Sequence, residues 1–271
     1  MRFFDFIPDE SVECYVQAWI HLYDEVEFEQ RLRPAVVICP GGAYEMISKR
    51  EAEPVALQFF AKGYNAFILN YSVKEKAKEF MPLCQLASTV LHIRNHSDEW
   101  MIDKEKIAVC GFSAGGHLAA SLGILHNEKT FLNVLGKTDN IRPNAMILGY
   151  PVITADEYGH VPTIENVSGA KRGSKEYRWF GLDKHVDSDT PPAFIWHTSE
   201  DSIVPVENSL KLSLALSNAK IPFELHVFPH GPHGMSVCTK EVENTMIPIV
   251  SDYPWVELCV KWMNRLFDFN L

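Results

Sequence analysis

The sequence predicts an α/β fold with a mostly parallel central sheet and helices on both of its faces. Short, continuously apolar segments alternate along the chain with segments whose spacing suits helices, and this alternation is typical of parallel sheets. The chain has 271 residues, 46% of them hydrophobic, which is enough to bury a large core. Because α/β folds of this size often form one domain, we expect a single domain over residues 1–271.

Six apolar segments are predicted strands, and five further segments are predicted helices. The strands are expected at residues 35–39, 66–71, 106–110, 145–150, 193–197 and 223–228. The helices are expected at residues 54–61, 82–95, 209–217 and 255–267, and directly after Ser113. The strands at 35–39, 66–71 and 106–110 are each followed by a predicted helix. The segments therefore form repeated βαβ units, which favours parallel pairing.

One long segment, residues 153–190, does not fit this alternation. It is polar, contains glycines and is too long for a simple connection, so it predicts a cap or lid inserted in the domain. Its aromatic residues Tyr158, Tyr177, Trp179 and Phe180 either line a substrate entrance or pack onto the main domain. Trp179 is taken from this group as a candidate substrate contact.

The segment 108–117 is the strongest chemical signal in the chain. Its apolar run is interrupted by a Gly-x-Ser-x-Gly motif centred on Ser113, and a helical pattern of small and apolar residues follows. This arrangement predicts a strained turn between a strand and a helix that presents a nucleophilic serine, with glycines that let the two elements pass closely. A glycine turn with an uninvolved serine is the alternative, which the flanking strand and helix patterns disfavour.

A serine nucleophile requires a histidine base and an acid that orients it. Asp201 follows the predicted strand at 193–197 and is preferred as the acid over its neighbour Glu200. His233 follows the predicted strand at 223–228, among turn-forming residues, and is preferred as the base over His230. His117 lies one helical turn beyond Ser113, where a structural role in packing or hydrogen bonding is expected.

Acyl transfer also requires donors for the negative charge that develops on the substrate carbonyl oxygen. The Pro-Gly-Gly-Ala-Tyr segment at residues 40–44 follows a predicted strand, and its small residues allow close approach of the backbone. The backbone N–H groups of Gly42, Ala43 and Ala114 are the predicted donors. Tyr44, at the end of this segment, is a candidate substrate contact.

Composition limits the partners of the protein. A net charge of −10 opposes binding to nucleic acid or to anionic membranes. We expect neither a signal peptide nor a spanning helix, and the six scattered cysteines suggest free thiols in the cytoplasm. No metal-ligand spacing is apparent, so neither a metal nor another cofactor is expected. The expected partner is a small-molecule substrate, and a homodimer is the default assembly.

Four segments follow one another along the chain: the Pro-Gly-Gly-Ala-Tyr segment, the Gly-x-Ser-x-Gly motif, and the loops around Asp201 and His233. Together they resemble those of α/β-hydrolase esterases related to hormone-sensitive lipases and acetyl-xylan esterases. The resemblance covers nearly the whole chain and implies an α/β-hydrolase fold. It also implies the roles already suggested by the residues: Ser113 as nucleophile, Asp201 as acid, His233 as base, and Gly42, Ala43 and Ala114 as oxyanion donors.

Two departures from the family pattern lie in the oxyanion segment. Pro40 and Ala43 replace the first and last residues of the usual His-Gly-Gly-Gly loop, and alanine still offers its N–H group. The proline version resembles the sugar-esterase branch, which implies removal of acyl groups, acetyl above all, from a sugar or another small alcohol. An amidase, formamidase or peptidase with the same triad, and a ligand-binding protein without catalysis, are the alternatives.

Overall fold

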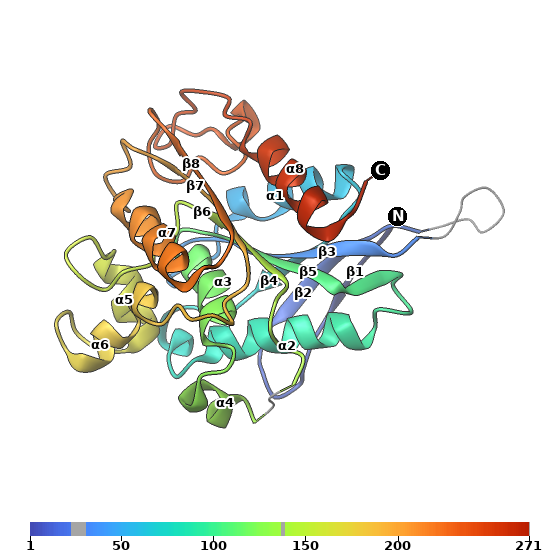
Figure 1. Cartoon of the computed structure of the whole chain (residues 1–271), viewed down its shortest axis with the longest axis horizontal. Helices are drawn as coiled ribbons and strands as arrows, with labels where there is room; N and C mark the ends of the chain where they lie inside the picture. The colour runs from blue at the N-terminus through green and yellow to red at the C-terminus, as the bar shows by residue number, and fades with distance from the viewer. Residues whose placement is uncertain (23–30, 137–138, 271) are drawn as a thin grey trace.

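The computed structural model describes residues 1–22, 31–136 and 139–270. These residues form an eight-stranded sheet between two layers of helices (Figure 1). The sheet has the strand order β1-β2-β4-β3-β5-β6-β7-β8. Its strands are β1 (Arg2–Phe6), β2 (Tyr15–Ile20), β3 (Arg33–Cys39), β4 (Asn65–Asn70), β5 (Ile102–Phe112), β6 (Ala145–Gly149), β7 (Ala193–Thr198) and β8 (Phe223–Phe228).

Parallel pairing runs from β4 through β3, β5, β6 and β7 to β8, which confirms the predicted mostly parallel sheet. The two N-terminal strands β1 and β2 pair antiparallel at the other edge and were not predicted. Their sequences mix apolar and polar residues because β1 is largely exposed, whereas the interior strands β3, β4 and β6 are buried along almost their full length. Continuous apolar segments therefore indicated the parallel strands and missed the antiparallel pair β1 and β2.

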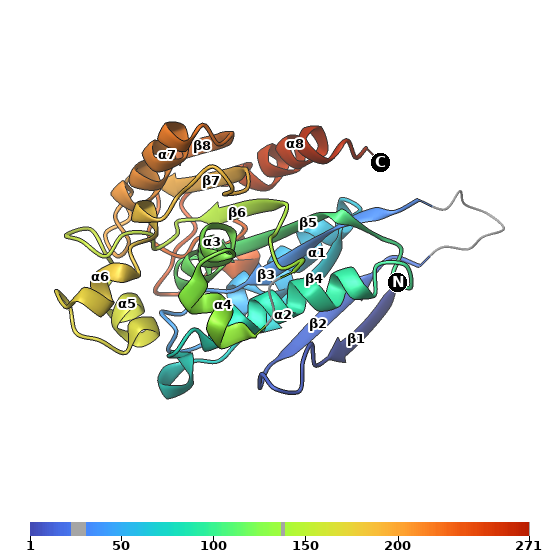
Figure 2. The same ribbon diagram turned by 60° about the horizontal axis from the view of Figure 1, so that its bottom comes forward.

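The helices cover both faces of the sheet, as predicted (Figure 2). α2, α3 and α7 contribute to the core on one face, whereas α1 and α8 contribute to the core on the other. Their bounds are α1 (Glu53–Ala61), α2 (Met81–Asn95), α3 (Ala114–Leu125), α4 (Lys129–Leu135), α5 (Val161–Ser168), α6 (Lys175–Trp179), α7 (Glu207–Ala219) and α8 (Trp255–Phe267). Single-turn 3-10 helices lie at Lys49–Glu51, Lys74–Ala77, Leu182–Lys184 and Lys240–Val242.

Short or extended elements account for the other differences from prediction. α4 was not predicted, and its seven residues are preceded by the N-cap residue Glu128, whose side chain accepts hydrogen bonds from the N–H groups of Thr130 and Phe131. β5 begins at Ile102, earlier than expected, because residues 103–106 are polar and partly exposed and so gave no apolar signal. The six cysteines are free and buried, as expected. Among the described residues, no helix has the length and apolar character needed to cross a membrane.

The segment predicted to form a cap contains α5, α6 and one 3-10 helix. α5 and α6 lie side by side beyond the main sheet (Figures 1 and 2). Asn208 at the start of α7 anchors the beginning of the segment, since its side chain accepts hydrogen bonds from the N–H groups of Ile153 and Thr154. Asn208 also donates to the carbonyl of Tyr158. The position of this segment is thereby tied to the helix that follows β7.

Candidate active site

Ser113 occupies the turn between β5 and α3, at the carboxyl end of the parallel strands. Its backbone has φ 54° and ψ −118°, a conformation that costs a non-glycine residue about 1–3 kcal/mol. The turn depends on its glycines because a Cβ on Gly111 would lie 2.0 Å from the carbonyl oxygen of Gly115. A Cβ on Gly115 would lie 2.0 Å from the carbonyl oxygen of Cys39, at the end of β3. Strand, turn and helix are therefore packed backbone against backbone around Ser113.

His233 lies in the loop after β8 and contacts both predicted partners. Its Nε2 is 2.8 Å from Ser113 Oγ, and its Nδ1 is 2.6 Å from Asp201 Oδ2. The carboxylate can only accept, so Nδ1 carries the proton and Nε2 is free to accept the serine proton. The imidazole is thus held in the tautomer that general-base catalysis requires.

Asp201 lies in the loop after β7 and is only 4% exposed. Its Oδ1 accepts hydrogen bonds from the N–H groups of Ile203 at 3.0 Å and Val204 at 2.9 Å. Burial by itself would raise the pKa of the carboxyl group, but hydrogen bonds from His197 and His233 outweigh it and hold that pKa well below its usual range. Asp201 is therefore ionised and able to stabilise a positive charge on His233.

The two rejected candidates form a separate pair on the surface. His230 Nδ1 lies 2.9 Å from Glu200 Oε1, and both side chains are more than half exposed. The same two loops thus carry two acid–histidine pairs, of which only Asp201 and His233 reach Ser113. No group of three or more histidine, cysteine, aspartate or glutamate side chains in the described ranges is arranged to hold a metal ion.

The predicted oxyanion segment leaves its donors free. Among the described residues, the backbone N–H groups of Gly42, Ala43 and Ala114 have no hydrogen-bond acceptor. Gly42 has φ 125°, and a Cβ there would lie 2.0 Å from the carbonyl oxygen of Met46. Ala43 has φ 56°, which is again strained for a residue with a side chain. Unsatisfied donors on a strained loop, beside a nucleophile at a helix start, are suited to bind an oxyanion.

Comparison with known proteins identifies the family. Residues 20–216, more than half of the chain, match the BD-FAE family. The chain belongs to the BD-FAE family. This result confirms the predicted resemblance to α/β-hydrolase esterases.

Two solved structures are similar to this BD-FAE chain over nearly its whole length. An acetyl ester-xyloside bifunctional hydrolase from Caldicellulosiruptor lactoaceticus is 32% identical, with a TM-score of 0.80, and the match covers 97% of this chain and 92% of that one. MGS-M1, an α/β hydrolase from a Medee basin deep-sea metagenome library, is 33% identical, with a TM-score of 0.81 and 99% of both chains covered. The predicted α/β-hydrolase fold is confirmed.

A curated relative of this BD-FAE chain is the acetylxylan esterase of Xylanibacter ruminicola. It is 30% identical over 215 residues, which are 76% of this chain and 42% of that protein. The chain spans less than half the length of the first curated relatives that it matches.

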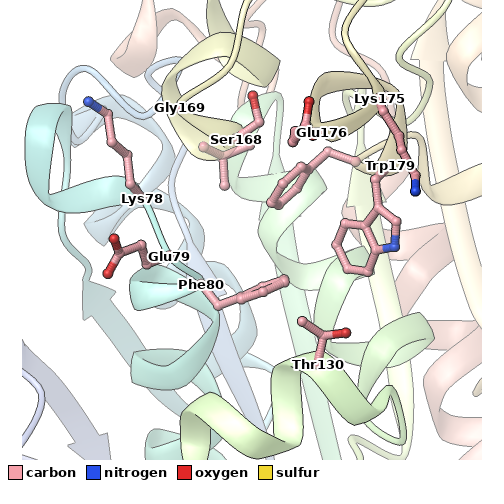
Figure 3. A pocket seen from close by; sticks show the side chains of 11 residues that line it. Lys78, Glu79, Phe80, Thr130, Ser168, Gly169, Lys175, Glu176 and Trp179 are labelled. Carbon is pink, nitrogen blue, oxygen red and sulfur yellow. The ribbon is translucent and has the colours of Figure 1, made fainter.

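The two candidate substrate contacts of the BD-FAE chain lie in different surroundings. Tyr44 is 1% exposed, and its hydroxyl donates to Nδ1 of His117, whose Nε2 bonds the carbonyl of Phe180. The side chain of Tyr44 thus packs into the protein beneath the backbone of the oxyanion segment, and His117 has the structural role expected of it. Trp179 lines a cavity of about 560 Å³ together with Phe80 and Phe180 (Figure 3). Neither Ser113 nor His233 lines that cavity.

One residue near the triad was missed at the level of sequence. His160 precedes α5 in the predicted cap and is half-buried, and its Nδ1 lies 2.8 Å from Thr163 Oγ1. Burial, and to a lesser degree the electrostatic influence of His233, lowers the pKa of His160, and the charge of Asp201 partly offsets this effect. Nothing in the surrounding sequence distinguishes His160, because its position depends on how residues 153–190 fold.

Proposed function

We propose that this protein is a serine ester hydrolase that removes short acyl groups, acetyl above all, from a carbohydrate or another small alcohol. The observation that carries the proposal is the continuous chain of hydrogen bonds from Ser113 through His233 to Asp201, beside three N–H groups that have no acceptor in the described part of the chain. A nucleophile, a base with its orienting acid, and an oxyanion site together meet the needs of acyl transfer.

In the first half of the proposed reaction, Ser113 Oγ attacks the ester carbonyl while His233 Nε2 takes its proton. Negative charge moves to the carbonyl oxygen, which the N–H groups of Gly42, Ala43 and Ala114 stabilise. One such donor lowers the activation barrier by about 3–4 kcal/mol in serine hydrolases. His233 then protonates the departing alcohol as the C–O bond breaks, which leaves an acyl group on Ser113.

In the second half, water enters where the alcohol has left. His233 removes a proton from the water, the hydroxide attacks the acyl carbon, and the same donors hold the second oxyanion. The carboxylic acid product forms as Ser113 Oγ recovers its proton from His233, and the acid then ionises in water. Asp201 stays ionised throughout and stabilises the imidazolium in both halves of the cycle.

A carbohydrate ester is the substrate class that the comparisons favour. Two relatives of the protein are an acetylxylan esterase and an acetyl ester-xyloside bifunctional hydrolase. We also propose that residues 153–190 form a cap that shapes the acyl and alcohol sites. This proposal is supported by a hydrogen bond of 2.9 Å from Asn166 Nδ2 in α5 to the carbonyl of Ala43, which joins the segment to the oxyanion loop.

The test is hydrolysis of aryl esters of increasing acyl length, together with acetylated xylo-oligosaccharide and matching anilides. We expect turnover that is highest for acetyl esters and that falls more than about a thousandfold in Ser113→Ala. Ser88→Ala is the matched control, because Ser88 is buried in α2 and its hydroxyl has no partner among the described residues.

The outcomes separate the competing functions. Turnover of esters that persists in Ser113→Ala contradicts the proposed nucleophile. Hydrolysis of anilides in preference to esters favours an amidase instead. A protein that binds acetylated sugars without turning them over favours a ligand-binding role.

A further inference from the structure

A buried carboxylate lies directly behind the oxyanion segment. Glu51, the last residue of the 3-10 helix Lys49–Glu51, is only 4% exposed. Its Oε2 accepts a hydrogen bond of 2.8 Å from the backbone N–H of Gly41. A Cβ on Gly41 would lie 2.6 Å from this oxygen and 3.1 Å from Ser113 Cβ. The Gly41 backbone is therefore held between the Glu51 carboxylate and the turn that carries the nucleophile.

The other oxygen of Glu51 reaches the opposite side of the site. Oε1 accepts a hydrogen bond of 2.7 Å from the hydroxyl of Tyr150, the residue after β6. That hydroxyl in turn accepts one of 2.9 Å from the N–H of Ser236, in the loop that carries His233. The Tyr150 ring also packs edge-on against His233, with 5.0 Å between the ring centroids.

The residue before Glu51 fixes the same loop. Arg50 Nη1 donates to the carbonyl of Gly234 at 2.8 Å, and the Ser236 hydroxyl donates to the carbonyl of Arg50. The guanidinium group thus bonds backbone carbonyls and forms no ion pair with Glu51. Within the described parts of the chain, no basic side chain pairs with the Glu51 carboxylate.

Burying a carboxylate without a cation is costly unless several donors bind it. Here one donor, the N–H of Gly41, directly precedes the oxyanion donors Gly42 and Ala43. The other donor, the Tyr150 hydroxyl, is itself bonded by the N–H of Ser236 in the loop of the base His233. Hydrogen bonds from neutral donors to an ionised acceptor are short and directional, so they limit movement of both loops.

We infer that Glu51 is a positioning residue for ester cleavage, which holds the oxyanion loop through Gly41 and the His233 loop through Tyr150 at a fixed separation around Ser113. The inference rests on the proposed function, because it assigns Glu51 to the transition state of that reaction. Loosening either loop displaces donors that act only when charge develops, so the loss falls on kcat and spares KM.

The experiment compares Glu51→Gln, Tyr150→Phe and the wild-type protein with an acetyl ester as substrate. Glutamine keeps the shape of the side chain, but its amide supplies only one acceptor for the two donors. We expect kcat to fall at least tenfold in both variants, with KM within about twofold. We expect the affinity for an alkyl boronic acid, which mimics the tetrahedral intermediate, to fall by a similar factor.

Tyr64→Phe is the matched control for loss of a buried hydroxyl bond. Tyr64 bonds Asn264 of α8 and lies outside the site, so kcat should stay within twofold of wild type. Thermal unfolding identifies the temperature at which all variants are folded, and the kinetics are measured there.

A kcat loss smaller than tenfold in Glu51→Gln, an equal loss in Tyr64→Phe, or a loss confined to KM overturns the inference. Failure of the proposed function is distinguishable, because it appears as undiminished turnover in Ser113→Ala. Full activity in Glu51→Gln with an inactive Ser113→Ala variant would leave the proposed function standing and remove only the role of Glu51.

Discussion

At the scale of single residues, two neighbouring carboxylates have different surroundings. Asp201 is buried and bonds His233, whereas Glu200 is exposed and bonds His230. The two acid–histidine pairs come from the same two loops, and they differ in contact with Ser113 and in access to water. Water screens the interaction between Glu200 and His230 because that pair is exposed. Only the buried Asp201 pair, which contacts Ser113, is therefore expected to matter for catalysis.

Replacing Asp201 by asparagine tests this difference. The amide keeps the shape of the side chain, but it removes the negative charge and can favour the wrong tautomer of His233. We expect kcat for an acetyl ester to fall about 10³–10⁴-fold, with KM little changed. Steady-state kinetics of Asp201→Asn and of Glu200→Gln measure the effect. Glu200→Gln should remain within twofold of wild type, and equal losses in both variants would contradict the assignment of the acid.

At the scale of secondary structure, the site depends on backbones that approach each other closely. α3 can follow β5 through Ser113 only if Gly115 passes beside the carbonyl of Cys39 at the end of β3. The oxyanion segment leaves β3 at this same point. The glycines of the motif thus fix the distance between the nucleophile and the loop of donors, as well as permitting the turn.

Gly115→Ala tests that close approach. The added methyl group overlaps backbone atoms that cannot move without displacing β3, so we expect the free energy of unfolding to fall by at least about 3 kcal/mol. Gly136→Ala provides the comparison, because a Cβ there meets nothing within 4 Å and only its positive φ of 67° opposes alanine. That variant should lose about 1 kcal/mol. Urea unfolding measures both, and similar losses would show that steric overlap at Gly115 is unimportant.

At the scale of the whole molecule, buried neutral histidines link stability to pH. Burial, partly offset by the hydrogen bond to Phe180, lowers the pKa of His117 to about 4. In the unfolded chain that pKa is about 6.5, so the unfolded state binds the extra proton first as pH falls. The contribution of His117 to stability is therefore fully present above about pH 6.5 and is lost progressively between about pH 6.5 and 4.

We expect the free energy of unfolding to fall by about 3 kcal/mol across that range through His117 alone. His21, whose pKa burial also lowers to about 4, adds to the fall. Urea unfolding at several pH values measures it. His117→Gln should be less stable at pH 7 but should depend less on pH between 6.5 and 4. An unchanged slope in this variant would show that His117 does not carry the effect.

Much of the fold was predictable because parallel strands with two covered faces have a distinctive sequence. Residues 35–39 and 193–196 are continuously apolar, and both lie in buried strands of the structure. β1 and β2 were missed because polar and apolar residues mix in their sequences, and β1 at the edge of the sheet is largely exposed. Among the candidate site residues, those in glycine-rich turns were recognisable because the backbone conformation itself restricts the amino acids allowed.

The sequence by itself determined the α/β architecture, the turn at Ser113 and the loops that hold Asp201 and His233. Each of these depends on residues that are neighbours in the chain. Only the tertiary structure decided which side chains meet, since Ser113 and His233 are 120 positions apart. It also placed Tyr44 in the core and Glu51 beneath Gly41, although the sequence around Glu51 is that of a charged surface turn. Packing determines the partners of a side chain, and packing is a property of the whole fold.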